Sequence, residues 1–161
     1  MKKSILIYLS VFSCIAALAN EPELIFSSSV SELNEAFNWS KNTALNFAHD
    51  GTDPVGLWYE AALHQSIGGE ILRLSDHNYN MMMKFAESIS APKDWCTYWE
   101  INRYNLPAPV DYVNDEQFWY NLPANFDVVQ ACYRLYEWTG DKEYLYNPVL
   151  VNFYEKTLNE Y

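Results

Sequence analysis

The sequence predicts an all-α fold built from antiparallel helical hairpins. Apolar residues recur at the three- and four-residue spacing of helices through most of the chain. The segments with this spacing begin or end at capping residues, glycine or proline. No two segments show the alternation that is typical of paired strands. Because helices joined by short loops pack as antiparallel neighbours, 161 residues of this pattern indicate one helical domain.

The first two predicted helices lie before residue 75. A capping box of Ser29 and Glu32 begins the first helix, and Gly51 ends it. The second covers residues 64–74 and is weak, because the adjacent glycines 68–69 lie inside it. The apolar stripe of the first helix consists of Leu33, Ala36, Phe37, Ala44, Phe47 and Ala48.

The third predicted helix is capped by Ser75 or Asp76 and closed by Pro92. An ordered, proline-rich loop follows over residues 94–122, and a short β-hairpin within it remains open as an alternative. The apolar stripe of this helix consists of Met82, Phe85, Ala86 and Ile89.

The last part of the chain carries the clearest helix signals. Pro123 opens a strong helix that Gly140 terminates, and Asp141 can cap the segment that follows. Residues 147–148 are Asn-Pro, which starts a final helix that continues nearly to Tyr161. Local chemistry therefore fixes both ends of the fourth helix and the start of the last.

The final predicted helix leaves two alternatives open. It carries no C-terminal glycine, and aromatic residues make up 17% of the chain, which is high for a small free-standing bundle. An amphipathic helix needs cover for its apolar face. Either this helix packs back on the bundle, or it is covered by a further domain beyond Tyr161 or by self-association with a second copy.

The first 19 residues predict a signal peptide. Residues 2–3 are lysines, residues 5–17 are mainly apolar, and residues 17–19 form an Ala-x-Ala cleavage signal. The apolar run is too short to span a membrane as a helix. We expect a secreted or periplasmic protein, and a lipoprotein anchored at Cys14 is the rival interpretation.

The expected mature domain, residues 20–161, is strongly acidic. Loss of Lys2 and Lys3 leaves eight basic residues against 21 acidic ones, a net charge of −13. This charge argues against nucleic acid and anionic membranes as partners. No Cys or His spacing resembles a zinc site. Cys96 and Cys132 form either a disulfide or two buried thiols.

Residues 94–127 concentrate aromatic rings, carboxylates and side-chain amides, with three prolines among them. Sugars suit such a surface, because their C–H faces lie on aromatic rings while their hydroxyl groups bond carboxylates and amides. The sequence therefore indicates carbohydrate as the partner. A structural loop whose aromatic rings plug the core is the alternative.

Glycoside hydrolysis needs two carboxyl groups, one as proton donor and one as nucleophile or base. Glu100 is the first candidate, since Trp99 precedes it and flanking prolines stiffen its loop. Glu60, within a Trp-Tyr-Glu segment, is the second, and Asp111 is the third. Each acid has a structural alternative, such as a bond from Glu100 to Arg103.

The candidate substrate-binding residues are aromatic, amide and acidic side chains. The rings can stack on sugar or pack in the core, and the amides can bond hydroxyl groups or form turns. The acid begins a helix, where free backbone amides stabilise it without any catalytic task. These candidates are Trp58, Trp95, Trp99, Asn102, Trp119, Asn121 and Asp127.

Residues 56–63, 94–112, 118–127 and 135–141 resemble the six-hairpin glycosidase superfamily, near secreted bacterial proteins related to α-L-rhamnosidases. The resemblance covers about residues 30–161. It implies an (α/α)6 barrel with its active site in loops at one end of the inner ring. It also implies glycoside hydrolase activity on an oligo- or polysaccharide, with no cofactor and no metal.

The chain departs from the family pattern in two ways. A complete barrel is far longer, so the resemblance implies only its N-terminal portion, an incomplete (α/α)6 barrel. A loop containing Gly, Arg and Asp in the relatives is absent between Leu63 and His64. The expectation is a truncated or inactive hydrolase, and a non-catalytic carbohydrate-binding or structural fragment is the alternative.

Overall fold

The computed structural model describes residues 24–49, 59–60, 63–102, 104–120 and 122–160. These residues are mostly helical, which confirms the predicted helical class. The predicted signal peptide lies outside the described residues. The helices are α1 (Ser31–His49), α2 (Leu63–Ile71), α3 (Ser75–Glu87), the 3₁₀ helix η1 (Ala91–Lys93), α4 (Leu122–Thr139), α5 (Glu143–Tyr146) and α6 (Pro148–Asn159). The strands are β1 (Tyr59–Glu60), β2 (Glu100–Ile101), β3 (Tyr112–Asn114) and β4 (Gln117–Phe118).

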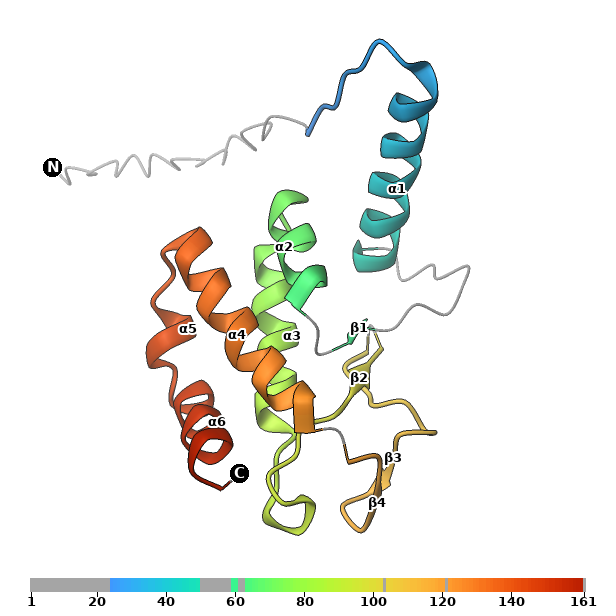
Figure 1. The fold of residues 1–161 in the computed structure, drawn as a ribbon. Coiled ribbons are helices and arrows are strands. Elements are labelled where there is room, and N and C mark those ends of the chain that lie inside the picture. Colours follow the sequence, from blue (N-terminus) through green and yellow to red (C-terminus); the bar gives the residue numbers. More distant parts are fainter. Residues whose placement is uncertain (1–23, 50–58, 61–62, 103, 121, 161) are drawn as a thin grey trace, which may run out of the picture.

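Helices α2 to α6 form one packed bundle, and α1 stands apart from it in Figure 1. α4 packs on α2, α3 and α5, while α6 packs on α3 and α5. Full burial of one large apolar side chain contributes about 1.5–3 kcal/mol, so this shared core is the main stabilising element. The core side chains are Met81, Met82, Phe85, Ala86, Ile101, Ala124, Val128, Ala131, Cys132, Leu135, Tyr144, Leu150 and Phe153.

The predicted capping box at the start of α1 is wrong. The side chain of Asn34 makes the turn instead: its Oδ1 accepts from the Ser28 amide at 2.7 Å, and its Nδ2 donates to the Ser28 carbonyl at 2.9 Å. The hydroxyl of Ser28 accepts from the Val30 amide. Asn34 lies inside the helix and bonds the backbone of the turn that precedes it, and the helix itself begins at Ser31. The predicted end at Gly51 lies outside the described residues.

Helix α2 confirms the weak predicted helix, and Gly69 has a packing role there. A Cβ atom on Gly69 would lie 2.5 Å from Oδ1 of Asn78 on α3. The buried Asn78 donates to the Ser66 carbonyl and to Glu70 Oε1, both at 2.7 Å. The absence of a side chain at Gly69 therefore allows α2 and α3 to approach closely. Helix propensity alone does not indicate this packing role.

The predicted ends of the third helix are also revised. Leu74 occupies the N-cap position without a side-chain cap bond, and Ser75 instead donates to Glu70 at 2.6 Å. The helix ends at Glu87, before Pro92, because the chain turns at Ser88 and restarts in η1. Ser88 Oγ donates to the Phe85 carbonyl at 2.7 Å and thereby closes the last turn.

The signals at Pro123, Gly140 and Asn147 are confirmed, whereas Lys142 and not the predicted Asp141 occupies the N-cap position of α5. Pro123 lies in the first turn of α4, and Gly140 follows that helix with a positive φ of 71°. Asn147 caps α6, since its Oδ1 accepts from the Val149 amide at 2.9 Å. Helix α6 packs back on the bundle through Leu150 and Phe153, both fully buried.

Two short antiparallel strand pairs add to the predicted helices. β3 and β4 form the hairpin left open within the loop, with Tyr112 opposite Phe118. β1 and β2 pair residues far apart in the chain, with Glu60 opposite Glu100. The sequence did not indicate this second pair, because two-residue strands are too short to show alternation.

The structure keeps Cys96 and Cys132 as separate, buried thiols rather than a disulfide. Burial raises the pKa of Cys132 to about 12, so its thiol stays protonated at neutral pH. No helix in the described part of the chain is both long and apolar enough to cross a membrane.

Candidate functional site

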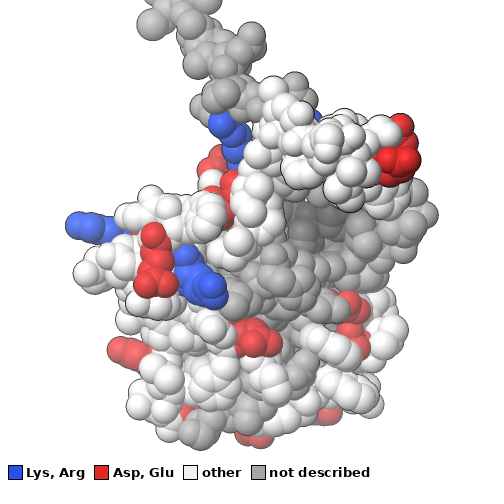
Figure 2. Space-filling model, turned by 45° about the horizontal axis from the view of Figure 1, so that its top comes forward, with Lys and Arg blue, Asp and Glu red and all other residues white. Residues whose placement is uncertain are grey.

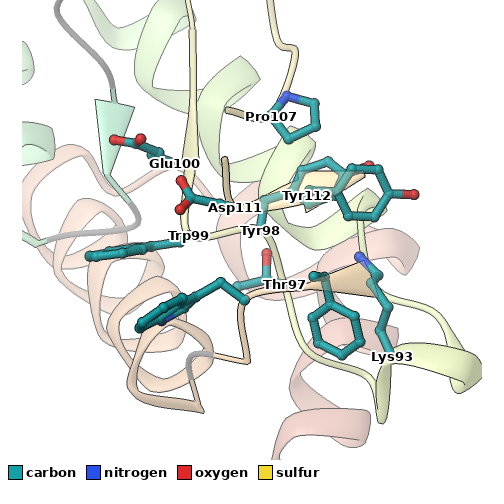
Figure 3. Close-up of a pocket in the computed structure, with 10 residues that line it drawn as sticks. Lys93, Thr97, Tyr98, Trp99, Glu100, Pro107, Asp111 and Tyr112 are labelled. Carbon is teal, nitrogen blue, oxygen red and sulfur yellow. The ribbon is translucent and has the colours of Figure 1, made fainter. Parts of the chain in front are cut away.

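A hollow lies where the segment after α3 meets the β3–β4 hairpin (Figure 3). The hollow is shallow and open, and the space in it amounts to about 220 Å³ when the adjoining solvent is counted. Four of the side chains expected to act on sugar line it together. The lining residues are Lys93, Thr97, Tyr98, Trp99, Glu100, Pro107, Asp111, Tyr112, Phe118 and Trp119.

Backbone geometry brings the acids and the rings to this hollow. Glu100 begins β2, directly after Trp99. Asp111 precedes β3, and Trp119 follows β4. The Trp119 amide donates to the Asp111 carbonyl at 2.6 Å, so the two ends of the hairpin are joined beside the hollow. Residues separated along the chain thus share one small surface.

Trp99 and Trp119 form a stacked pair. Their ring centroids lie 5.9 Å apart with an interplanar angle of 26°. This separation is typical of offset aromatic stacking. The side chains are 37% and 58% exposed, respectively. The pair therefore presents flat apolar surface to solvent at the edge of the hollow.

Asp111 is the most unusual acid of the site. It is only 7% exposed, and its Oδ2 has no hydrogen-bond partner among the described residues. Figure 3 shows the Asp111 and Glu100 carboxylates turned toward the same side of the hollow, next to the Trp99 ring. Leaving a buried polar oxygen unpaired is costly. Oδ2 is closed to solvent, so a ligand donor reaches it only when neighbouring side chains move.

The opposite end of the hollow holds a buried lysine. Lys93 is 1% exposed and donates to the Ser88 carbonyl. Its Nζ lies 4.4 Å from the ring centroid of Tyr98 and 5.2 Å from that of Tyr112. Burial lowers the pKa of Lys93, and the nearby Asp115 carboxylate partly offsets this effect.

Asp115 fastens the hairpin to the segment after α3. It accepts from Ser90 Oγ at 2.6 Å and from the Tyr112 hydroxyl at 2.8 Å. These two bonds hold the pKa of Asp115 below its usual value. The same carboxylate accepts a hydrogen bond from the Tyr112 hydroxyl, and this bond raises the pKa of Tyr112. The hairpin that carries Asp111 is therefore anchored at its far end.

Three other predicted residues lie in the described structure but do not line the hollow. The backbone at Trp95 is in the left-handed region, with a φ of 58°. The Nζ atom of Lys156 on α6 lies 4.1 Å from the centroid of the Trp95 ring. Asn102 shapes a turn, with its Oδ1 accepting from the amides of residues 104 and 106. Asp127 lies within α4, half-buried.

The remaining candidates are placed only in part. Trp58 and Asn121 lie outside the described residues, and so does the side chain of Glu60. The backbone of Glu60 lies opposite that of Glu100 in the β1–β2 pair. Two of the three candidate catalytic acids therefore share a strand pair.

Four residues that line the hollow were not predicted from the sequence as site residues: Lys93, Tyr98, Tyr112 and Phe118. No spacing indicates Lys93, because its aromatic neighbours come from two separate segments. Tyr112 carries a weak signal, since it stands three residues before Asp115 across a tight turn.

Residues of the kinds that bind metals do not gather in the described part of the chain: no group of three or more His, Cys, Asp or Glu there could hold an ion. Comparison of the chain with family models, curated proteins and solved structures found no match.

Proposed function

We propose that this chain is a secreted or periplasmic glycoside hydrolase-like protein that holds a carbohydrate at the hollow beside Trp99 and Trp119. The observation that carries the proposal is the buried, unpartnered Oδ2 of Asp111 next to the stacked rings. In this proposal, the helices correspond to the first hairpins of an (α/α)6 barrel, with the hollow among its active-site loops.

A sugar ring matches both halves of this surface. Its hydroxyl groups are donors that a buried carboxylate oxygen lacks, and its C–H face can lie against an exposed indole. A purely apolar ligand would leave Asp111 unsatisfied, and a purely polar one would gain nothing from the exposed rings. The combined demand for donors and a flat apolar face supports carbohydrate.

Hydrolysis is supported by the pairing of acids at the hollow. Glycoside hydrolases use two carboxyl groups that flank the scissile bond. Glu100 and Asp111 line the same space, and the backbone of Glu60 lies opposite Glu100. We propose Glu100 and Asp111 as the pair that supplies acid and nucleophile or base.

A non-catalytic binding role is the second candidate, and the exposed stacked rings favour it. Trp99 and Trp119 offer a flat surface on which one sugar ring can lie. Binding without bond cleavage needs only the stacked rings and one acceptor.

Sugar release from a panel of polysaccharides tests hydrolysis and binding together. The panel is measured with the purified chain and with the variants Glu100→Gln and Asp111→Asn. The matched control is Asp76→Asn, since Asp76 is an exposed acid on α3. Hydrolysis predicts product from the unaltered chain and the control, and loss in both site variants. Bound glycan without any product supports the binding role instead.

A further inference from the structure

We propose that the hollow selects uncharged sugars over acidic ones, and that Asp111 is the residue that determines this specificity. This inference rests on the proposed carbohydrate function. It concerns which sugar units can occupy the hollow: neutral hydroxylated rings, as opposed to uronic acid or sulfated units.

Asp111 sets what a ligand can place beside it. A carboxylate accepts hydrogen bonds and donates none. The Oδ2 of Asp111 is closed to solvent and lacks a partner among the described residues, so a donor that reaches it as the neighbouring side chains move on binding would satisfy it. A neutral sugar offers hydroxyl donors from every position of its ring. A carboxylate or sulfate group placed there offers none and adds a like charge at a poorly solvated position.

The cation that lines the hollow is already engaged. Lys93 is, among the described residues, the one Lys or Arg that lines it. Its ammonium group donates to the Ser88 carbonyl, lies over the Tyr98 ring and faces the carboxylate of Asp115. Turning this buried group toward a ligand anion would break those contacts, so it does not serve as an anion receptor.

The charge of the whole chain acts in the same direction. The formal net charge is −11. Figure 2 shows acidic side chains spread over the described part of one face and fewer basic ones, which lie toward its top and left. An acidic polysaccharide therefore meets long-range repulsion as well as the local demand of Asp111. Salt screens the long-range part within about 10 Å at 0.1 M, whereas a desolvated contact is screened much less.

The test uses matched glycans that differ in charge. Oligogalacturonides as free acids and as methyl esters share one backbone, and a glycan panel supplies other neutral and acidic members. Binding to the purified chain is measured by calorimetry at 0.05 M and 0.5 M salt. We expect neutral members to bind at least tenfold more tightly than their acidic counterparts, with most of this ratio retained at high salt.

Substitution of Asp111 separates local from global effects. Asp111→Asn should shrink the neutral-to-acidic ratio at least threefold, while Asp76→Asn leaves it unchanged. Asp111→Ser provides a second variant if the amide fails to fold, as judged by circular dichroism. A ratio that disappears at high salt, or that survives in both Asp111 variants, overturns the assignment to Asp111.

The outcomes distinguish this inference from the function on which it rests. Acidic glycans that bind as tightly as neutral ones, and lose binding in Trp119→Ala, overturn the selectivity while supporting the carbohydrate site. Absence of any Trp119-dependent binding across the panel overturns both proposals. Neutral-selective binding that depends on both Trp119 and Asp111 supports both.

Discussion

The backbone amide of Trp119 donates to the backbone carbonyl of Asp111 across 2.6 Å. This bond joins the exposed indole and the buried carboxylate of the proposed sugar site through the main chain. The hairpin between them is fixed at its other end by Asp115, which accepts from Ser90 and Tyr112. Trp119 and Asp111 are therefore held in a fixed position relative to each other. Such preorganisation lowers the entropic cost of binding a ligand.

We expect Asp115 to make the chain sensitive to acid. Hydrogen bonds from Ser90 and Tyr112 lower the pKa of Asp115 in the folded chain. Its contribution to stability is therefore complete above the unfolded pKa of about 4 and is lost as the pH falls through the lower folded value. Thermal melts between pH 2 and pH 7 measure it. Asp115→Asn should flatten this acid limb, and an unchanged limb would contradict the role given to Asp115.

Gly69→Ala should destabilise the chain by about 2 kcal/mol, because the new Cβ would displace the buried amide of Asn78 and break its bonds to Ser66 and Glu70. Gly68→Ala is the matched control. Its Cβ would meet nothing within 4 Å, so the higher helix propensity of alanine should stabilise α2 by up to about 1 kcal/mol. Urea titration compares the two; equal effects would show that packing on Asn78 is not the cause.

Asn125→Ala should lower the free energy of unfolding by about 1–3 kcal/mol, since it leaves buried polar groups without partners. Asn125 accepts from the Thr97 amide at 2.9 Å and donates to the Trp95 carbonyl at 2.9 Å and to Thr157 at 3.1 Å. Asn80→Ala, at an exposed side chain, should change stability by no more than about 0.5 kcal/mol. Similar losses in both variants would refute this bridging role.

The thiols of Cys96 and Cys132 should be unreactive in the folded chain. Both are buried, and burial raises the pKa of Cys132 to about 12. Ellman's reagent at pH 8 should therefore label neither thiol until denaturant is added, after which both react rapidly. Rapid labelling of either thiol without denaturant would contradict their placement in the core.

Local sequence signals predicted those parts of the fold that depend on neighbouring residues alone, such as helix ends. Pro123, Gly140 and Asn147 each act within one turn, and the helices that they delimit are confirmed. The β1–β2 pair joins Glu60 to a segment forty residues later, and no local pattern of two-residue strands reveals it. Helix propensity alone marks Gly69 as a residue that weakens α2, because its close approach to Asn78 on α3 leaves no local signal in the sequence.

The site was predictable to the same extent. Residue chemistry selected Trp99, Glu100, Asp111 and Trp119, and the structure brings them to one hollow. The same reasoning selected Trp95, which a left-handed backbone turn directs toward Lys156 on α6. Composition identifies which side chains suit a ligand, but only the turn conformations decide which of them meet.

Glycan binding by Trp119→Ala is the decisive measurement for a carbohydrate site at this hollow. Trp138→Ala is the control, because Trp138 is 60% exposed, close to the 58% of Trp119, and lies on α4 among residues that do not line the hollow. We expect the unaltered chain and Trp138→Ala to bind the same glycans equally, while Trp119→Ala binds at least tenfold more weakly. Equal binding by all three proteins, or none by the unaltered chain, would contradict a carbohydrate site at this hollow.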